Sequence, residues 1–590
     1  MRNLFSRYRH SPRSPLAALA GAGLLVGLAL LCLAPAPLAN AQPARATQGA
    51  SAAARAAASL CPPNSTLRSA QTTSPAQFAA TLRVPTDYAT IQAAVNAAQA
   101  NDLILIAPGV YHEAVIVCTA DITIRGEDRN TTILDGQSQL INGFTVLADN
   151  VVIENMTAHH YKGNGFFWTY QKGYRGSYLT AYDNGDYGIY AYGSTLGEFD
   201  DDYASGSPDS GFYIGQCFPC DAIITRVHSE WNGLGYSGTN AGGNIVLEDS
   251  VWDENSAGIV PNTLDSEQGP PQRGGAFINN YVHDNGNPLA PYTSWAHIPF
   301  GTGILVAGGD KDYVAYNKVV NNPEYGIAVT ANLDQNFWLA TGNVVEHNTV
   351  SGSGLDDLAL SLPNGPNNCF SDNEATTTVP AFLETTHACG TPLPLAGTGD
   401  FGVTLRLFTA DVNTGLNGPG PSFNPPDWRK APTPPAQTPM SDVSAPPAPI
   451  MLDPMPASAP FADNFPVITN QFTPATRGDA AMFQPLGFSG FSLVQFLLSF
   501  YGDALLFALY GAWLSVAFVE LAHREDLGGG MRLLWGIITL AIPILGPILY
   551  YFLGRSKLTF RFRLALVVGA PILLLVIAGL LMVVASYTLL

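Results

Sequence analysis

Charged residues are scarce in this chain of 590 residues. Asp, Glu, Lys and Arg together make up 12% of it, about half the share found in an average globular protein. Basic residues are the rarer kind, since 27 Lys and Arg stand against 46 Asp and Glu and leave a net charge of −19. Proteins that bind nucleic acids need Lys and Arg to neutralise phosphates, so the composition excludes a nucleic-acid partner. A hydrophobic share of 47% excludes a disordered acidic protein.

Cysteine is rare as well, with seven residues in the whole chain. Cys32 lies in an N-terminal apolar run, and an even set remains: Cys61, Cys118, Cys217, Cys220, Cys369 and Cys389. An even number in an exported protein predicts disulfides. The Cys217-Phe-Pro-Cys220 spacing also occurs in redox motifs, but no βαβ pattern surrounds it, so a structural disulfide is the favoured interpretation. A zinc site is disfavoured because no second Cys or His pair has ligand spacing.

Both ends of the chain carry long apolar runs. At the N-terminus, four arginines precede an apolar stretch over 16–33 and an Ala-x-Ala sequence over 39–41, which predicts a signal peptide over 1–41. An uncleaved membrane helix is the alternative. At the C-terminus, apolar runs over 504–521, 533–553 and 564–590 predict a membrane domain of three transmembrane helices over 488–590. The chain is therefore expected at the cell membrane, with its middle part on the extracytoplasmic side.

The segment Arg532–Arg555 resembles the short N-terminal membrane module of cardiolipin synthases, on the basis of Pro543, Gly546 and Pro547. The catalytic His-x-Lys motif of those enzymes is absent, so the resemblance implies no phospholipid chemistry.

Two linkers complete the organisation. Residues 42–81 are rich in Ala and Ser and predict a flexible leader, and 14 prolines between Pro419 and Pro460 predict an extended linker over 416–487.

Glycines recur at a fixed period in the middle of the chain. Gly165, Gly188 and Gly211 are 23 residues apart, and a similar spacing separates two later pairs, Gly235 and Gly258, and Gly303 and Gly326. Large or apolar residues follow these glycines, and Asn-rich turns precede several of them: Asn184, Asn232, Asn255 and Asn322. Such a repeat predicts a parallel β-helix over 82–415 with an internal asparagine ladder. One coil carries an insertion near 288–300.

The start of this region is also informative. Residues 84–98 have helical apolar spacing with Thr86 or Asp87 as a candidate N-cap, and short strands are predicted within 102–117, 122–126 and 131–136. A capping helix followed by such strands resembles the pectin-lyase-like superfamily over about 82–375. The resemblance implies an all-β fold, a right-handed parallel β-helix. It leaves the activity open, because the superfamily includes lyases, hydrolases, esterases, epimerases and proteins without catalytic activity.

The catalytic signatures of that superfamily are missing here. The chain lacks the Gly-x-x-Asp-Phe-Ile-Phe-Gly strand of pectin methylesterases, the full set of polygalacturonase patches and the Asp-Pro-His motif of alginate epimerases. Arg226 and Arg273 could serve as a pectate-lyase-like base, but no pattern assigns that role. The absence of these motifs favours a non-catalytic adhesin or scaffold as the alternative. A copper-site maturation factor, like the periplasmic proteins that help load nitrous oxide reductase, ranks last because no dense His or Met cluster is visible.

Candidate site residues follow from the repeat. Asp186 and Asp209 lie one period apart, so their carboxyl groups are expected to stack and to act as acid and base or to bind a cation; solvated turn residues are the alternative. Phe167, Tyr190 and Tyr213 occupy equivalent positions of the repeat, and their side chains point outward if that of Ile189 points inward. Together with Trp168 they are expected to bind sugar rings, with an internal aromatic stack as the alternative.

Further candidates are less well supported by the pattern. Asp200, Asp201 and Asp202 form an acidic run that could bind calcium, or simply a solvated loop. His228 and His283 follow strands and could be bases, or ordinary surface histidines. The sequence therefore predicts a membrane-tethered, extracytoplasmic β-helix that binds or processes a polysaccharide. If it is an enzyme, it is expected to be a lyase or a glycoside hydrolase.

Overall fold

A computed structural model describes residues 60–62, 65–69, 78–334, 336–390, 399–414, 425–450, 513–524, 526–541, 545–554, 556, 558–559 and 563–569. The predicted signal peptide over 1–41 lies outside these residues. So do most of the predicted leader and parts of all three predicted membrane helices.

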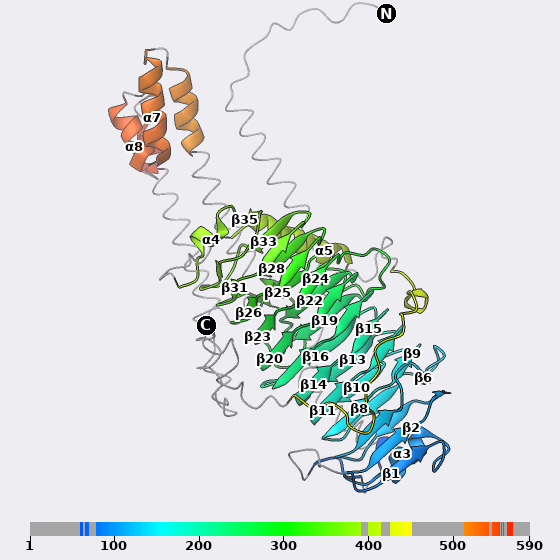
Figure 1. The fold of residues 1–590 in the computed structure, drawn as a ribbon. Coiled ribbons are helices and arrows are strands. Elements are labelled where there is room, and N and C mark those ends of the chain that lie inside the picture. Colours follow the sequence, from blue (N-terminus) through cyan, green and yellow to red (C-terminus); the bar gives the residue numbers. More distant parts are fainter. Residues whose placement is uncertain are drawn as a thin grey trace, which may run out of the picture. The chain divides into compact units, whose positions relative to one another are not determined.

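Three parallel sheets wind around a common core and form a parallel β-helix (Figure 1). Sheet A has twelve strands: β1 (Thr81–Val84), β2 (Leu103–Ile106), β5 (Thr123–Gly126), β8 (Val151–Glu154), β11 (Lys172–Ser177), β14 (Thr195–Asp200), β17 (Ala222–Thr225), β20 (Gly242–Glu248), β23 (Arg273–Ile278), β26 (Tyr313–Ala315), β31 (Val344–Glu346) and β34 (Cys369–Ser371). Each strand pairs with its equivalent in the next coil, so no coil has to bury its core alone.

The other two sheets follow the same rule. Sheet B has ten strands: β3 (Gly109–Tyr111), β6 (Thr132–Asp135), β9 (Thr157–His159), β12 (Thr180–Tyr182), β15 (Tyr203–Ser205), β18 (His228–Glu230), β21 (Val251–Asp253), β24 (Tyr281–His283), β27 (Lys318–Val320) and β32 (Thr349–Ser351). Sheet C has eleven: β4 (Val115–Val117), β7 (Phe144–Val146), β10 (Phe166–Thr169), β13 (Tyr187–Tyr192), β16 (Ser210–Gly215), β19 (Leu234–Thr239), β22 (Ala257–Asn262), β25 (Ile304–Ala307), β28 (Tyr325–Thr330), β33 (Asp356–Leu360) and β35 (Thr378–Val379).

The predicted glycine file exists and marks the start of the sheet C strands. A Cβ atom on Gly165 would lie 2.8 Å from the carbonyl oxygen of Gly188, and one on Gly188 would lie 2.6 Å from that of Gly211. The residues that follow these glycines are fully buried, among them Phe166, Ile189 and Phe212. The 23-residue period therefore predicts both the stacking and the inward face correctly.

The predicted asparagine ladder is confirmed at the turn between sheets B and C. The side-chain oxygen of Asn255 accepts from the backbone N–H of Asn232 at 2.9 Å, and that of Asn285 accepts from Asn255 at 3.2 Å. A second ladder runs through Asn280, Asn317 and Asn348 at the turn between sheets A and B. These amides satisfy buried backbone N–H groups that no strand can reach.

Replacing Asn255 by alanine should lower the free energy of unfolding by about 2–3 kcal/mol, because the buried N–H of Asn232 loses its acceptor. Chemical denaturation of the full-length chain measures the loss. The control is Asn96→Ala on an exposed helical position, expected to change stability by less than about 0.5 kcal/mol. Equal losses in both variants would contradict a stabilising ladder.

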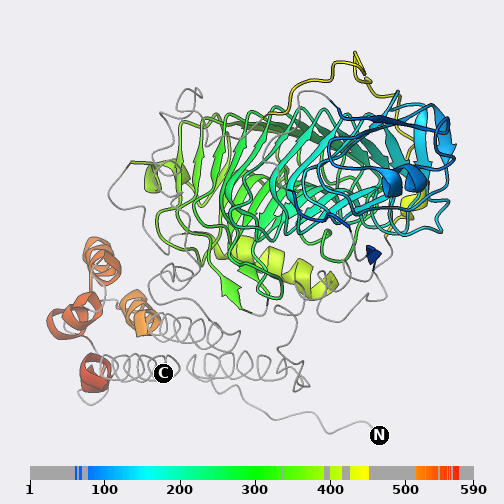
Figure 2. The ribbon, with the colours of Figure 1, turned by 90° about the horizontal axis from the view of Figure 1, so that it is seen from below.

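The helix at the start of the β-helix begins later than the sequence indicated. Helix α3 (Ile91–Ala97) is capped by Thr90, whose side chain accepts from the N–H of Ala93 at 3.1 Å, not by Thr86 or Asp87. The carboxylate of Asp87 instead closes the preceding turn on the N–H of Arg83. The helix packs against β1, β2 and β4 and covers the first coils (Figure 2).

The six cysteines among the described residues form three disulfides: Cys61–Cys118, Cys217–Cys220 and Cys369–Cys389. The first of them attaches part of the predicted leader to β4. Residues 65–69 also contact the first coils, since the N–H of Asp149 donates to the carbonyl of Leu67 at 2.9 Å. The described part of the leader is therefore bound to the β-helix.

Two insertions and several short elements complete the fold. The predicted insertion is present between β24 and β25, and a second long loop joins β22 to β23 over 263–272. The remaining elements are the antiparallel pair β29 (Asn332–Leu333) and β30 (Phe337–Trp338), and the helices α4 (Leu383–Thr386), α5 (Phe401–Thr414), η1 (Trp428–Lys430), α7 (Gly529–Ala541), α8 (Leu545–Leu553) and η4 (Ala565–Gly569). Among the residues described, none of the helices combines the length and apolarity that crossing a bilayer requires.

Candidate active site

The candidate site lies on the outward face of sheet C at strands β13 and β16. Ile189 pairs with Phe212, and Tyr190 pairs with Tyr213. Because side chains alternate along a strand, the two buried residues leave both tyrosines on the outside of the coil. Tyr190 is partly exposed on this face, whereas Tyr213 is covered by its neighbours.

Asp186 and Asp209 stack at the start of these two strands. The backbone N–H of Asp209 donates to the carbonyl oxygen of Asp186 at 3.1 Å, so the residues occupy equivalent positions in successive coils. Burial raises the pKa of Asp186 to about 6. Burial, followed by the charge of Asp186, raises the pKa of Asp209 to about 8, although a hydrogen bond from Tyr187 lowers it in part. At neutral pH one carboxyl group is therefore ionised and its neighbour is protonated.

Three aromatic rings form a stack beside the carboxyl pair. The ring centroids of Phe167 and Tyr190 lie 4.7 Å apart at an interplanar angle of 16°, and those of Tyr187 and Tyr190 lie 4.2 Å apart at 23°. All three rings are partly exposed. The ring centroids of Tyr213 and Tyr190 lie 4.8 Å apart in an edge-to-face contact. Because Tyr213 is only 2% exposed, it packs against the stack without offering a free face.

Trp168 is not part of this surface, contrary to the expectation from the sequence. It is fully buried, and its indole N–H donates to the carbonyl of Val151 at 3.3 Å. The reason is the alternation of β10, in which Phe167 points outward and its neighbour must point into the core.

The two insertions border the site. In the 263–272 loop, the carboxylate of Glu267 accepts from the side-chain amide of Gln216, and the amide of Gln268 donates to the hydroxyl of Tyr170 at 2.5 Å. From the insertion before β25, the N–H of Thr293 donates to the carbonyl of Pro208 at 2.8 Å, directly before Asp209. The sequence pattern did not single out Gln216, Glu267 or Gln268, because loop residues outside the repeat carry no periodic signal.

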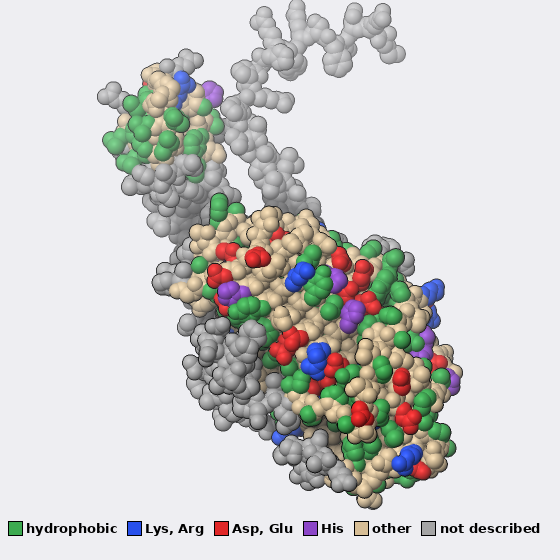
Figure 3. All heavy atoms as spheres, viewed as in Figure 1, with side chains coloured by type: hydrophobic (Ala, Val, Ile, Leu, Met, Phe, Trp, Pro, Cys, Tyr) green, Lys and Arg blue, Asp and Glu red, His purple; other side chains and the backbone are tan. Residues whose placement is uncertain are grey.

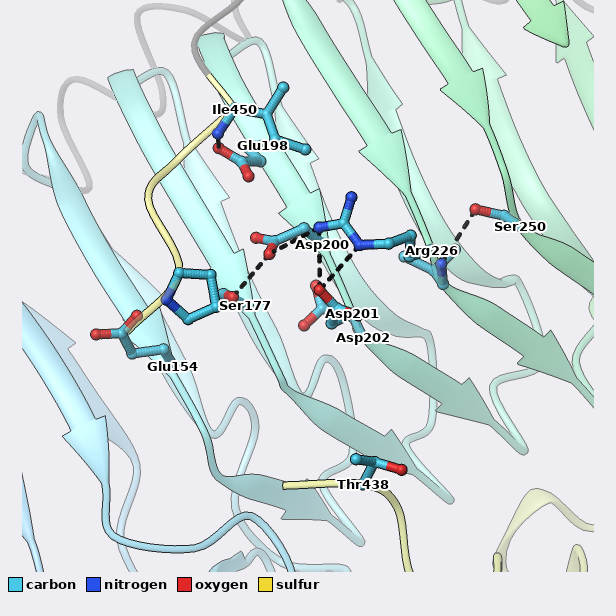
Figure 4. Close-up of polar contacts among 12 residues, drawn as sticks. Glu154, Ser177, Glu198, Asp200, Asp201, Asp202, Arg226, Ser250, Thr438 and Ile450 are labelled. Carbon is cyan, nitrogen blue, oxygen red and sulfur yellow. Dashed lines mark hydrogen bonds and ion pairs between the residues drawn. The ribbon is translucent and has the colours of Figure 1, made fainter. Parts of the chain in front are cut away.

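The acidic run Asp200–Asp202 does not gather its carboxylates into a calcium site. Asp200 faces outward on sheet A and pairs with Arg175 at 3.1 Å, whereas Asp201 pairs with Arg226 at 3.0 Å. Asp202 points inward, where it accepts from the N–H of Leu179 at 2.6 Å. Asp201 has a left-handed φ of +55°, which ends the alternation of β14, so Asp202 turns into the core. The carboxylates of Asp200 and Asp201 instead share the guanidinium of Arg226 at 3.4 and 3.0 Å (Figure 4).

A row of buried charges on sheet A binds part of the proline-rich segment predicted as a linker. Arg125, Arg129 and Arg175 donate to carbonyl oxygens of Val443, Thr438 and Pro447 at 2.7, 3.2 and 3.3 Å, in that order. In return, side-chain oxygens of Asn130 and Asn155 accept from the N–H groups of Gln437 and Met440 at 2.9 and 3.0 Å. The carboxylate of Glu198 accepts from the N–H of Ile450 at 2.9 Å (Figure 4). We call residues 437–450 the strap. Proline-rich backbone cannot extend a sheet ladder, so side chains supply its partners.

Histidines gather on the outward side of sheet B, which the sequence analysis did not foresee. Acidic and histidine side chains lie next to one another on the molecular surface, where Lys and Arg are few (Figure 3). Among the described residues, two groups could hold a metal ion: Asp135, His159 and His160, and His228, Glu230 and Asp253. Burial and the neighbouring His160 lower the pKa of His159 to about 4. Burial lowers the pKa of His228, but the hydrogen bond to Asp253 and the charges of Asp253 and Glu230 together outweigh burial and raise the pKa overall.

Residues 164–337 match the family model of the right handed beta helix region. The coils described above are therefore those of a right-handed β-helix. Residues 511–555 match the phospholipase D-nuclease N-terminal model, over the stretch whose sequence resembles the cardiolipin synthase membrane module. No curated protein matches the chain.

Several solved structures are similar to about half of the chain. The mannuronan C-5 epimerase AlgE6 A-module of Azotobacter vinelandii is 16% identical, with 49% of this chain and 94% of that chain covered and a TM-score of 0.37. The alginate lyase of Paenibacillus sp. strain FPU-7 is 14% identical, with 50% of this chain and 99% of that chain covered and a TM-score of 0.32. The DFA-IIIase of Arthrobacter chlorophenolicus A6 without its lid is 11% identical, with 49% of this chain and 94% of that chain covered and a TM-score of 0.34.

Proposed function

We propose that the sheet C site hydrolyses a glycosidic bond in a neutral polysaccharide. The observation that carries this proposal is the carboxyl pair Asp186 and Asp209, whose pKa values are raised to about 6 and about 8 beside a stack of aromatic rings. Two titratable groups held at different pKa values in one site divide the acid and base roles between them.

In this scheme Asp209 stays protonated at neutral pH and gives its proton to the leaving glycosidic oxygen. Asp186 is ionised and acts on the opposite side of the sugar, as nucleophile or as base towards water. Tyr187 supports the acid role, because its hydrogen bond holds the side chain of Asp209 in place. Phe167 and Tyr190 offer flat faces on which a sugar ring can stack.

The charge of the site favours a neutral sugar over a uronate. Burial alone accounts for the raised pKa of Asp186, and Glu267 adds a further negative charge near Asp209. Among the described residues, no Lys or Arg contributes to the pKa of either carboxyl group. A polyuronate would therefore meet repulsion without a compensating cation.

The chain is further proposed to act at the cell surface. Support comes from the signal-like N-terminus and the apolar C-terminal runs. Residues 511–555 also match the phospholipase D-nuclease N-terminal model, over the stretch that resembles a membrane module. The three disulfides agree with an oxidising compartment.

The test uses the purified full-length chain on an array of neutral and acidic glycans, followed by product analysis of the glycans that bind. Binding and cleavage of neutral glycans are expected. Tyr190→Ala should weaken binding by about 10-fold, the effect of losing one stacking ring of about 1.4 kcal/mol. Tyr281→Ala on sheet B is the matched control and should leave affinity unchanged.

Each outcome has a defined meaning. Binding without products would favour the non-catalytic adhesin, and a preference for polyuronates would contradict the charge argument. If neither glycan class binds, the proposed function fails.

A further inference from the structure

A second cluster of chemically active side chains lies on sheet B, away from the sheet C site. Asp135 ends strand β6, and His159 ends the neighbouring strand β9, where the two residues pair directly. His160 follows at once. Their side chains are partly exposed, at 21%, 12% and 33% in that order.

The backbone explains why two consecutive histidines point to the same place. Neighbouring residues in a strand point to opposite faces. His160 instead has a φ of +54°, which ends the strand and turns its ring back towards His159. The left-handed conformation of His160 therefore lets the adjacent pair converge.

The three donor atoms lie within 4.8 Å of one another, close enough for one metal ion to reach all of them. The Nδ1 atoms of His159 and His160 lie 2.5 Å apart, and they lie 3.7 and 3.8 Å from Oδ1 of Asp135. Binding an ion at bond lengths of about 2.0 Å in a tetrahedral site requires the two Nδ1 atoms, which lie at hydrogen-bond distance without an ion, to move apart to about 3.3 Å.

Neighbouring residues hold the two rings in place. Oδ2 of Asp183 lies 3.6 Å from Nε2 of His160, the nitrogen that faces away from the cluster. A carboxylate near the outer ring nitrogen of a histidine ligand is common in metal sites. Asp183 is 3% exposed, and its other oxygen has no hydrogen-bond partner. The ring of Tyr182 stacks on that of His159 at 4.6 Å and 14°.

We propose that Asp135, His159 and His160 bind a divalent transition-metal ion of the zinc class. Two imidazoles and one carboxylate suit such an ion, whereas calcium prefers oxygen ligands alone. The ion would join two successive coils. His112 is the candidate for a fourth ligand, since its Nδ1 lies 3.6 Å from Oδ2 of Asp135.

The other histidine group on sheet B provides the comparison. That group, His228, Glu230 and Asp253, offers one imidazole and two carboxylates, so it suits an ion of the zinc class less well than a group with two imidazoles. The proposal therefore concerns the first group only.

The experiment measures zinc bound to the full-length chain by equilibrium dialysis and elemental analysis, with zinc alone as the probe. The wild-type protein and His228→Ala should each retain the ion at the first group. His159→Ala with His160→Ala should weaken that binding by at least about 100-fold, and Asp183→Asn by about 10–100-fold. Circular dichroism confirms that each variant is folded. The melting temperature provides a second readout, because zinc should raise it in the wild-type protein and not in the double variant.

Two results would overturn the proposal. One is the absence of bound zinc at micromolar concentration in the wild-type protein. The other is unchanged affinity and stoichiometry in the folded double variant. Because the measurement involves no sugar and no turnover, its outcome is independent of the sheet C site.

Discussion

Replacing Asp209 by asparagine should reduce glycoside turnover by about 1000-fold or more while leaving the chain folded. Asparagine keeps the shape of the side chain but cannot give a proton to the leaving oxygen, and general acids contribute about 100- to 10,000-fold. Glycan affinity should change little, because Phe167 and Tyr190 keep their stacked geometry. Steady-state kinetics on the glycan identified by the array measures the loss.

The pH dependence separates the two carboxyl roles. In the wild-type protein, kcat/KM should rise as pH increases through about 6, where Asp186 ionises, and fall through about 8, where Asp209 loses its proton. A pH profile without a limb near 8 would contradict the assignment of Asp209 as the acid.

Asp209→Asn should lower activity, but it should raise stability relative to the wild-type protein as pH increases. The folded wild-type protein binds a proton at Asp209 that the unfolded chain releases near pH 4, so wild-type stability decreases as pH rises from about 4 to about 8. The asparagine variant lacks this decrease. Its stability relative to wild type should therefore increase over that range, as denaturation at several pH values would show. A variant that loses both activity and stability at pH 8 would indicate misfolding.

Replacing Arg175 by methionine should have the largest effect on stability, about 3–5 kcal/mol near pH 8. The guanidinium lies within 3.7, 3.5 and 3.1 Å of Glu154, Glu198 and Asp200, and its side chain is 8% exposed. Its removal leaves buried carboxylates without their shared cation. The strap also loses the hydrogen bond to the carbonyl of Pro447.

The loss should be smaller at lower pH. Burial, followed by the charge of Asp200, already raises the pKa of Glu198 to about 8, so protonation near pH 5 removes the unpaired charge and restores part of the stability. Arg429→Met is the matched control, because Arg429 and its partner Asp427 lie at the surface, where water can solvate both charges; a much smaller loss than in the Arg175 variant is expected. A pH-independent loss in the Arg175 variant would point to packing rather than charge.

The sequence predicted those features that follow from the repeat. The period placed Gly165, Gly188 and Gly211 in one file, and alternation then set Ile189 inward and Tyr190 outward. The same alternation excludes Trp168 from the surface, which the sequence interpretation overlooked by counting nearby aromatic residues instead of following the register.

Other features depend on contacts that carry no period. The pair His159 and His160 is visible in the sequence, but its convergence with Asp135 requires the register of two coils and a single left-handed residue. Likewise, proline content predicted that residues 416–487 avoid helix and sheet. It could not indicate that the side chains of Arg125, Asn155 and Glu198 would bind residues 437–450 along sheet A.

The strap also determines where a mechanical load would enter the β-helix. Residue 450 is held at Glu198 on β14, many coils before the last strand β35. Tension on the chain beyond residue 450 would therefore act first on the hydrogen bonds between the strap and sheet A, and not on the final coil. A protein anchored through its C-terminal region could in this way resist shear without unravelling from its end.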